Sequence, residues 1–399
     1  MTALALLDEL AAIGADPAGG WSRPAWGAGE QAAHDWFAAH ARAMGLSVRQ
    51  DAFGNSIARR EGCENLPAIA TGSHLDTVRG GGLYDGALGV VLGLAAAGRL
   101  PTGLRPLEVI AFRDEEGRFG PFTGSRAMTG DLAADALDRL RDADGVALRT
   151  AMADCGLAPA TPQAAARDMS DLAAWVEVHI EQGPVLEAAG LPLGIVTAIA
   201  GQERFSLRFT GQAGHAGTVP MDQRADALQA AAGFALAFDA LIRDAGGDAR
   251  GTIGILRLEP NQANVIPREA RLSLEIRDSD AARLARLAQE TEALARTIAQ
   301  DRRVTCQTRR LYSAAPVAMA AHLMAALEQA AHGRAMRLLS GANHDAGILG
   351  LHIPVAMLFV PSRGGISHTP DEHTDPGPIM AAADVLTATL ARLIESPGP

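Results

Sequence analysis

The chain has 399 residues, 48% of them hydrophobic and 20% charged, which is typical of a globular protein of about two to three domains. The formal net charge of −11, without any Lys/Arg-rich run, argues against a nucleic-acid partner. Three scattered cysteines outside any CxxC motif argue against a disulfide framework and favour a cytoplasmic protein.

The first 45 residues show helical periodicity, interrupted by a Gly/Pro/Trp-rich loop at residues 16–29. The start of the chain lacks a basic region and a small-residue cleavage site, so it predicts an amphipathic helix and not a signal peptide. Strands are expected at residues 47–50 and 56–60. Apolar runs such as residues 90–97 are far shorter than the ~20 residues of a membrane span, so no membrane association is expected.

The next segment has the order strand, loop, helix, strand. Residues 68–71 and 107–113 predict buried strands on either side of a helix at about residues 86–98. This order is the signature of a doubly wound α/β layer. Two helical segments and a third strand are predicted next, at residues 131–153, 161–166 and 175–180.

The pattern changes between residues 203 and 315, where the expected order is strand, helix, strand, strand, helix, strand. This order is typical of ferredoxin-like α+β modules. A helix at residues 317–333, a strand at 353–359 and a helix at 378–395 then return to α/β character. We therefore predict a doubly wound α/β domain, built from residues 1–202 and 316–399, with the ferredoxin-like domain inserted at residues 203–315.

The run GSHLDTVRGGGLYDGALG, residues 72–89, is the most informative motif. It places His74, Asp76 and Asp85 on glycine-bracketed backbone between a predicted strand and a predicted helix. Histidine and carboxylate side chains together suit a divalent cation such as zinc. Further acids and histidines follow the later predicted strands. They are Glu115, Glu116, His179 and His368.

Sites of open α/β sheets collect beyond the carboxyl ends of the strands, so we expect these residues to converge on one two-metal hydrolase centre. A binuclear centre needs a carboxylate that bridges two ions ~3.5–4 Å apart, and Asp85 is the candidate. His74 and His179 would complete the coordination of one ion, and Glu116 and His368 would complete that of the other. The ions could be zinc, manganese, cobalt or nickel, because His/carboxylate sites accept all four.

Glu115 and Glu116 stand in tandem after a strand, where adjacent side chains cannot face the same metal. We therefore assign Glu116 as a ligand and Glu115 as the catalytic base and later proton donor. Asp76, two residues after His74, is expected to assist catalysis by orienting the His74 imidazole. A turn-capping role is the alternative for Asp76.

Two divalent ions carry four positive charges, and two carboxylate ligands with one hydroxide carry three negative ones. The net charge of the site is therefore about +1. Such a site favours a small anionic substrate and keeps Glu115 ionised. His215 could stabilise an oxyanion, and Arg277 could grip a substrate carboxylate with two hydrogen bonds. A loop histidine and a surface arginine are the alternatives for these two. Gln182 and Asn264 are further candidates for substrate contact, as is His344, although residues 343–345 could instead have a structural role.

Eight motifs together resemble the amidase, hydantoinase/carbamoylase branch of the M20 metallopeptidase family, over about residues 20–392. This branch includes N-carbamoyl-L-amino acid hydrolases and allantoate amidohydrolases, and HIEQGP with GISH is specific to it. The motifs are GSHLDTV, YDGALGV, DEEGRFG, HIEQGPVLE, GQAGHAGTVPM, NVIP, SGANHDA and FVPSRGGISHTPDE.

The resemblance implies the same five metal ligands, with Asp85 bridging and Glu115 as base. It also implies a homodimer formed through the smaller domain, which closes over the substrate as a lid. The position of His215 would reach the active site of the partner subunit. The substrate contacts implied are Gln182, His215, Asn264 and Arg277, with Arg277 on the substrate carboxylate, and we add His344 and Gly365 as expected contacts.

The favoured function is hydrolysis of the carbamoyl (ureido) C–N bond of an N-carbamoyl-L-amino acid or similar carboxylate, with release of ammonia and carbon dioxide. An allantoate amidohydrolase, or an aminoacylase or dipeptidase with the same centre, is the alternative. A binding protein that has lost catalysis is disfavoured because Glu115 and all five ligands are present. Departures from the family pattern, such as EEGRFG and Asn343 before His344, lie where the substrate identity is set.

Overall fold

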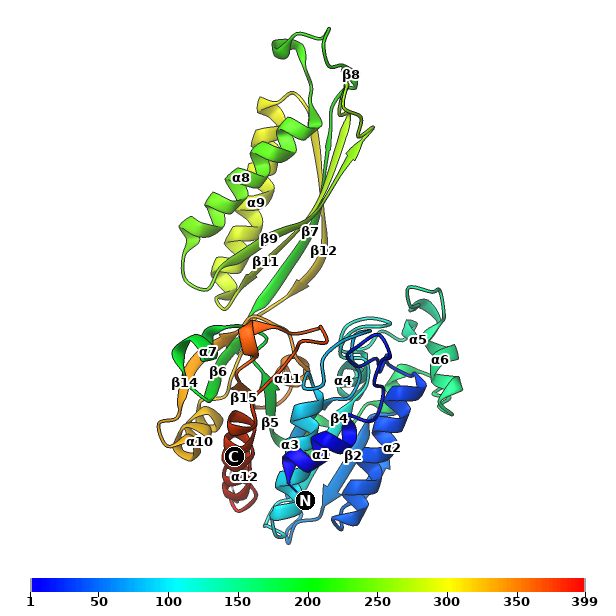
Figure 1. Cartoon of the computed structure of the whole chain (residues 1–399), viewed down its shortest axis with the longest axis vertical. Coiled ribbons are helices and arrows are strands. Elements are labelled where there is room, and N and C mark those ends of the chain that lie inside the picture. Colours follow the sequence, from blue (N-terminus) through cyan, green and yellow to red (C-terminus); the bar gives the residue numbers. More distant parts are fainter. Residues whose placement is uncertain (1, 398–399) are drawn as a thin grey trace. The chain divides into compact units, whose positions relative to one another are not determined.

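The structure, a computed structural model, describes residues 2–397 and divides the chain into two compact units (Figure 1). The smaller unit, Ala198–Val317, is inserted into the larger one, which comprises the residues up to Thr197 and those from Ala318. The sequence placed these boundaries at 203 and 315. No loop marks the first boundary, because β6 (Leu193–Ile199) is followed after a single residue by β7 (Gly201–Thr210).

A mixed sheet forms the centre of the larger unit, with strand order β1-β2-β4-β3-β5-β15-β6-β13 and β14 paired to β6. Its four middle strands, β4, β3, β5 and β15, are parallel to one another, whereas the flanking strands β2 and β6 are antiparallel to them. Each parallel strand therefore ends at the same edge of the sheet. The strands are β1 (Ser47–Gln50), β2 (Ser56–Arg60), β3 (Ala68–His74), β4 (Leu107–Phe112), β5 (Leu172–Ile180), β6, β13 (Val317–Ala318), β14 (Ala335–Ser340) and β15 (Val355–Val360).

The parallel strands are almost wholly buried, as expected where both faces of a sheet are covered. In β5, Val176 and Val178 pack in one core with α3 and α12, whereas the alternate residue Glu177 bonds to the start of α11. Gly89 and Gly93 let α3 approach the sheet closely, because a Cβ at Gly89 would lie 2.4 Å from the Val178 carbonyl oxygen.

The helices of the larger unit are short apart from α2, α3, α10 and α12. The helix expected over residues 131–153 is instead two short helices, α5 and α6. Asp142 breaks it, because its side chain accepts the backbone N–H groups of Asp144 and Val146 around Gly145 (φ +82°). The helices are α1 (Ala3–Leu10), α2 (Ala28–Ala43), α3 (Ala87–Arg99), α4 (Thr123–Thr129), α5 (Ala136–Arg139), α6 (Leu148–Asp154), α7 (Val185–Ala189), α10 (Ala321–Ala331), α11 (Asp345–Leu349) and α12 (Pro376–Ile394).

Among residues 2–397, α12 is the one helix long and apolar enough to cross a membrane by length and composition. Its apolar side chains Ile379, Leu386 and Leu390 are buried in the core of the larger unit, where α12 packs against α3. Core packing therefore accounts for the composition of this helix.

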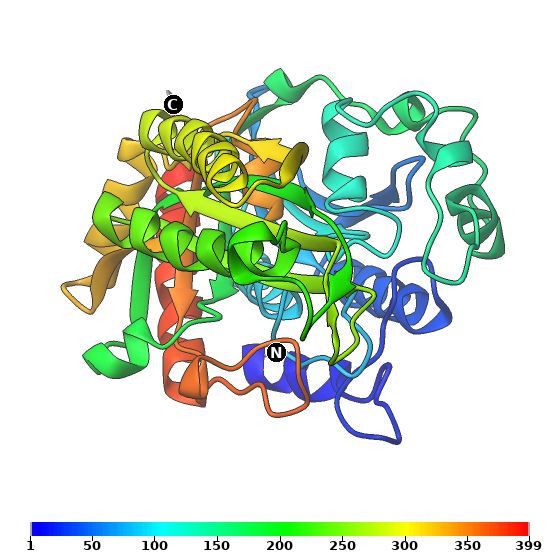
Figure 2. The same cartoon turned by 90° about the horizontal axis from the view of Figure 1, so that it is seen from above.

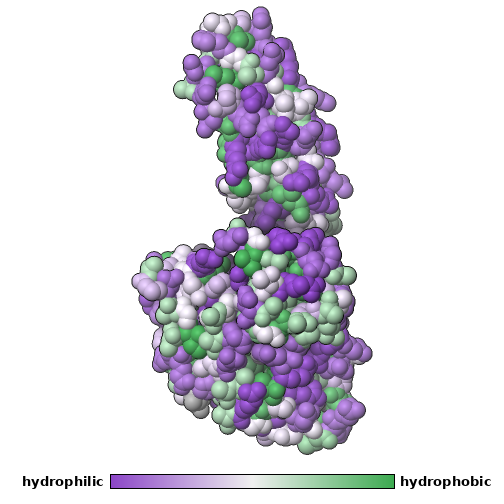
Figure 3. All heavy atoms as spheres, turned by 90° about the vertical axis from the view of Figure 1, so that its right-hand side faces the viewer, coloured by the Kyte–Doolittle hydropathy of each residue, from purple (hydrophilic) through white to green (hydrophobic). Residues whose placement is uncertain are grey.

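The smaller unit is an antiparallel sheet of order β12-β7-β11-β9, covered on one face by two helices that lie side by side (Figures 1 and 2). Phe205, Leu207 and Phe209 alternate with polar residues along β7 and pack under the helices. The surface of this unit seen in Figure 3 is mostly hydrophilic, with apolar groups only in small clusters. The elements are β7, α8 (Ala227–Ala245), β9 (Arg250–Glu259), β11 (Glu269–Asp278), α9 (Ala281–Asp301), β12 (Thr305–Ala314) and the short pair β8 (Gly214–His215) and β10 (Val265–Ile266).

Candidate metal centre

All five predicted ligands gather at the carboxyl edge of the four parallel strands. His74 ends β3, Glu116 follows β4, and His179 lies near the end of β5. His368 lies in the loop after β15, and Asp85 lies in the loop between β3 and α3. Four neighbouring strands thus bring together residues that are almost 300 positions apart in sequence.

We call His74, Asp85 and His179 the inner triad, whose ligand atoms all lie within 4.8 Å of one another. Asp85 Oδ1 is 3.7 Å from His74 Nε2 and 3.2 Å from His179 Nε2. Among the described residues, neither of these buried Nε2 atoms has a hydrogen-bond partner. Buried polar atoms normally have one, so two nitrogens that face one carboxylate oxygen fit a bound cation.

We call Asp85, Glu116 and His368 the outer triad, which meets the same 4.8 Å criterion. His368 Nε2 is 3.1 Å from Asp85 Oδ2 and 3.4 Å from Glu116 Oε2. Asp85 therefore turns Oδ1 to the inner triad and Oδ2 to the outer one. This is the arrangement that a carboxylate bridging two ions requires.

The two inner imidazoles are oriented by backbone carbonyls. Nδ1 of His74 lies 3.1 Å from the carbonyl oxygen of Asp76, and Nδ1 of His179 lies 3.0 Å from that of Ile180. A proton on Nδ1 satisfies each carbonyl and leaves the Nε2 lone pair free to bind a cation. Gly86 keeps space over His74, because a Cβ there would lie 2.4 Å from the ring.

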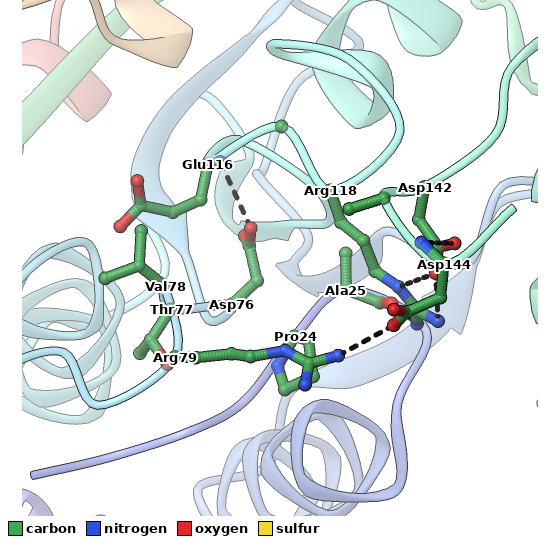
Figure 4. Close-up of a pocket in the computed structure, with 12 residues that line it drawn as sticks. Pro24, Ala25, Asp76, Thr77, Val78, Arg79, Glu116, Arg118, Asp142 and Asp144 are labelled. Carbon is green, nitrogen blue, oxygen red and sulfur yellow. Dashed lines mark hydrogen bonds and ion pairs between the residues drawn. The ribbon is translucent and has the colours of Figure 1, made fainter.

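The Asp76 carboxylate lies beside the His74 imidazole that it is expected to orient, and it also accepts two backbone N–H groups. Oδ1 accepts the backbone N–H of Glu115 at 3.2 Å, and Oδ2 accepts that of Glu116 at 3.1 Å (Figure 4). The carboxylate is 3.5 Å from His74 Nδ1, and the Asp76 carbonyl makes the shorter contact. Asp76 therefore positions the two glutamates.

The side chains of Glu115 and Glu116 point in different directions from the backbone that Asp76 holds. Glu115 Oε2 points to the inner triad, 3.7 Å from His74 Nε2, whereas Glu116 points to the outer triad. Burial raises the pKa of the Glu115 carboxyl well above its usual range, against the opposing effect of His74. A cation bound beside it would favour the ionised form and restore a proton acceptor.

The outer triad holds protons that a cation must displace. Burial, reinforced by the negative charge of Asp85, raises the pKa of Glu116 to about 7. A hydrogen bond to Asp85 raises the pKa of His368 to about 9. Both groups must be deprotonated to coordinate a metal.

We therefore expect metal affinity to fall as the pH falls, with release of more than one proton per outer ion at about pH 6. Below the raised pKa values of Glu116 and His368 both groups carry a proton in the metal-free protein, so lowering the pH stabilises that form against the metal complex. Calorimetric titration in two buffers of different ionisation enthalpy counts the protons released. Binding without proton release at this pH would contradict the assignment.

Gln182 touches the centre directly. Its Nε2 donates to Asp85 Oδ2 at 2.9 Å and to Ser367 Oγ at 3.1 Å. Gln182 and His368 both have left-handed backbone conformations, with φ of 55° and 60°. Such conformations cost free energy in residues other than glycine and often occur at functional sites.

His344 and Gly365 lie close to the ligand residues. The buried His344 ring is 4.5 Å from that of His179, centroid to centroid, and its Nε2 lies 2.8 Å from Ser340 Oγ. Gly365 (φ +68°) packs on the chain after β5, where a Cβ would lie 3.0 Å from Gly183. Both therefore support the His179 segment.

The remaining substrate candidates, His215, Asn264 and Arg277, lie in the smaller unit. His215 pairs with Val265, the neighbour of Asn264, so these two residues are adjacent at the tip of that unit (Figure 1). Arg277 lies at the other end of β11, eight residues beyond Glu269, which corresponds to about 27 Å along a strand. One unit therefore cannot bring all three residues to one small molecule.

A hollow of about 290 Å³ is lined in part by Asp76 and Glu116 (Figure 4). Two arginines line it, but Arg79 is paired with Asp144 at 3.3 Å and Arg118 with Asp142 at 2.9 Å. These pairs neutralise the guanidinium groups, so we do not assign the hollow as the site of a substrate carboxylate.

Sequence reasoning missed Glu177, a buried residue beneath the inner triad. Its carboxylate accepts hydrogen bonds from Ser73 Oγ at 2.7 Å, Trp175 Nε1 at 3.1 Å and the backbone N–H of Ala346 at 3.0 Å. It thus joins β3, β5 and α11 next to His74 and His179. An acid two residues before a predicted ligand, on the same face of the strand, was the signal available.

The chain is similar to known proteins over most of its length. A family model described as peptidase family M20/M25/M40 matches residues 70–393. An N-carbamoyl-L-amino acid amidohydrolase of Geobacillus stearothermophilus is 40% identical over 400 residues, covering 98% of this chain and 97% of that protein. An allantoate amidohydrolase of Bacillus subtilis is 38% identical over 362 residues, covering 88% of this chain and 87% of that protein.

The fold is also that of a solved structure. A crystal structure of an amidase of the hydantoinase/carbamoylase family from Burkholderia multivorans matches with a TM-score of 0.91 at 32% identity. The match covers 99% of this chain and 98% of that one, so both units have counterparts there.

Proposed function

This chain belongs to peptidase family M20/M25/M40, and we propose that it hydrolyses the carbamoyl C–N bond of an N-carbamoyl-L-amino acid or a similar ureido carboxylate. Its relatives make it an amidohydrolase that acts on C–N bonds of small molecules. One observation carries the mechanistic proposal, namely that two triads share Asp85 while Glu115 faces the inner one.

Enzymes of this family generally bind divalent metal ions, and the described residues offer suitable ligand groups. We propose two ions per subunit, one in each triad, with zinc as the first candidate and manganese, cobalt or nickel as the others. Such ions would polarise the scissile carbonyl and make a water molecule acidic. The unpartnered Nε2 atoms of His74 and His179 support the inner position.

Glu115 is the residue we assign to proton transfer. Its Oε2 would take a proton from the attacking water and deliver it to the leaving nitrogen. The Asp76 carboxylate holds the backbone of Glu115 in place for this task. One water and one ureido acid then give ammonia, carbon dioxide and an amino acid, so the atoms balance.

An anionic substrate fits the charges of the smaller unit. Arg277 Nε donates to Glu275 Oε1 at 2.6 Å, and Arg204 binds the same carboxylate at 2.6 Å. Two guanidinium groups around one carboxylate leave one net positive charge to attract the substrate carboxylate. We propose that Arg277 binds this carboxylate and that His215, Asn264 and Gln182 contact the ureido group.

We further propose that the protein is a homodimer, with the smaller unit as its interface and as a lid. The distance between His215 and Arg277 supports this, because each active site would need one of them from each subunit. The edge strand β9, with Ile255 and Leu256 about half exposed, is available for contact with a second copy. The three free cysteines support a cytoplasmic location.

The substrate proposal is tested by ammonia release. Metal-loaded protein is incubated with a panel of N-carbamoyl-L-amino acids, their D isomers, allantoate, N-acyl amino acids and dipeptides. We expect ammonia from at least one N-carbamoyl-L-amino acid. Ammonia from allantoate alone would favour the allantoate alternative. Release of an acid or amino acid without ammonia would show an aminoacylase or dipeptidase, and would contradict the proposal.

A further inference from the structure

Glu372 is a buried acid of the GISHTPDE motif to which none of the roles above applies. It lies four residues after His368 and is 4% exposed. Oε1 accepts the backbone N–H groups of Tyr84 at 2.8 Å and Asp85 at 3.0 Å. Oε2 accepts Ser367 Oγ at 3.0 Å and the backbone N–H of His368 at 3.4 Å. This one carboxylate therefore joins the two loops that carry Asp85 and His368.

The loop before Asp85 is shaped to admit this carboxylate. A Cβ on Gly82 would lie 2.0 Å from Glu372 Cδ, so only glycine leaves room for it. The bond from Asp85 to Glu372 spans 287 positions in the sequence. No local element of secondary structure could fix the relative position of these two loops.

Ser367 extends the contact from Glu372 to the ligand atoms. Its Oγ lies 3.0 Å from Glu372 Oε2 and 3.1 Å from Asp85 Oδ2, the oxygen that faces His368. Glu372 therefore acts on Asp85 twice, through the backbone N–H and through the Ser367 hydroxyl. Both contacts act on Asp85, which the two triads share. Glu372 also binds the backbone of His368 in the outer triad, whereas the two inner histidines are held by backbone carbonyls.

We propose that Glu372 is a positioning residue that builds the outer metal site by holding Asp85 and His368 at the correct separation. This inference rests on the proposed two-metal function. The physical reason is that a buried carboxylate with four donors fixes its neighbours rigidly, and residues that hold metal ligands typically contribute about 10- to 100-fold in metal affinity. The loss should weaken the outer ion most, because two of its three ligands, Asp85 and His368, depend on Glu372, whereas the inner ion shares only Asp85.

Two substitutions separate position from charge. Glu372→Asp keeps the charge but shortens the side chain by one methylene, so the carboxylate cannot reach both loops. Glu372→Gln loses the charge and the long 3.4 Å bond from the His368 N–H, but its carbonyl oxygen can still accept from Tyr84 and Asp85, and its amide can donate to Ser367 Oγ. If position matters, the aspartate variant should bind the outer ion about 10- to 100-fold more weakly and the glutamine variant should retain most of the affinity.

The test is metal titration of the full-length variants by competition with a chromophoric chelator, with elemental analysis of bound zinc and thermal unfolding as a check of folding. Glu108→Asp is the matched control, because Glu108 is equally buried but is paired with Arg59 and Arg167. It should bind two ions like the unmodified protein.

The inference is overturned if Glu372→Asp binds both ions normally, loses both equally, or binds better than Glu372→Gln. Fewer than two ions on the unmodified protein would overturn the proposed two-metal function itself, and this inference with it. Two ions on the unmodified protein, together with normal binding by Glu372→Asp, would overturn the inference alone.

Discussion

Replacing Glu115 with glutamine is expected to lower turnover by a factor on the order of 10² or more while leaving metal binding intact. Glutamine has nearly the same shape but cannot accept the proton of the attacking water. The side chain faces the inner triad, 3.7 Å from His74 Nε2, and it is not one of the ligands of either triad. Steady-state turnover and metal content of the same preparation measure the two effects.

Glu181→Gln is a matched control for this variant. Glu181 follows His179 by two residues, but its carboxylate accepts the N–H groups of Val185 and Leu186 and so faces α7. It should keep normal turnover. Full turnover by the Glu115 variant would show that another group is the base, and loss of metal would show that Glu115 is a ligand.

We also expect activity to be restored when two inactive variants are combined in one dimer. His215→Ala and Arg277→Ala should each reduce turnover by a factor on the order of 10² or more, because each removes a group that binds the reacting substrate. Within one subunit these residues lie at opposite ends of the smaller unit. A mixed dimer of the two variants should therefore contain one complete active site and one that lacks both groups.

Dimers that carry two different affinity tags isolate the mixed species. Its turnover should be about half that of the unmodified dimer, because one of two sites is complete. Doubly tagged dimers of His215→Ala alone control for the tags and should stay inactive. A mixed dimer as inactive as its parents would show that the residues act within one subunit, or that they do not act on the substrate at all.

The position of the site at the carboxyl edge of the sheet could be predicted from the sequence, because the ligands lie at or after the ends of strands that have a strong local pattern. The mostly apolar runs that form β3, β4 and β15 indicated where these strands end. His74 is the last residue of β3, and Glu116 and His368 lie in the loops that follow β4 and β15. Once strands are parallel, their carboxyl ends meet at one edge. Convergence therefore follows from topology, without knowledge of any long-range contact.

The residues that fix this geometry could not be predicted in the same way. Asp76 and Glu372 act by accepting backbone N–H groups from loops that are distant in sequence. Any residue type other than proline supplies such a donor, so these pairings leave no pattern in the sequence. Gly82 was visible only as one glycine among several, although its missing Cβ makes room for Glu372.

Local hydrogen bonding between a side chain and the backbone also made one predicted helix wrong. Residues 131–153 have helical composition, but the side chain of Asp142 forms a turn with the following backbone, and two short helices result. Asp and Asn compete with helical hydrogen bonds in this way. Strands β6 and β14 lie outside the parallel core and were not predicted.

The most direct test of the two-metal account is anomalous X-ray diffraction from crystals of the unmodified protein grown with manganese. We expect two anomalous peaks about 3.5–4 Å apart, one on each side of the Asp85 carboxylate, with His74 and His179 on the first and Glu116 and His368 on the second. A single peak, or peaks that do not share Asp85, would contradict the account.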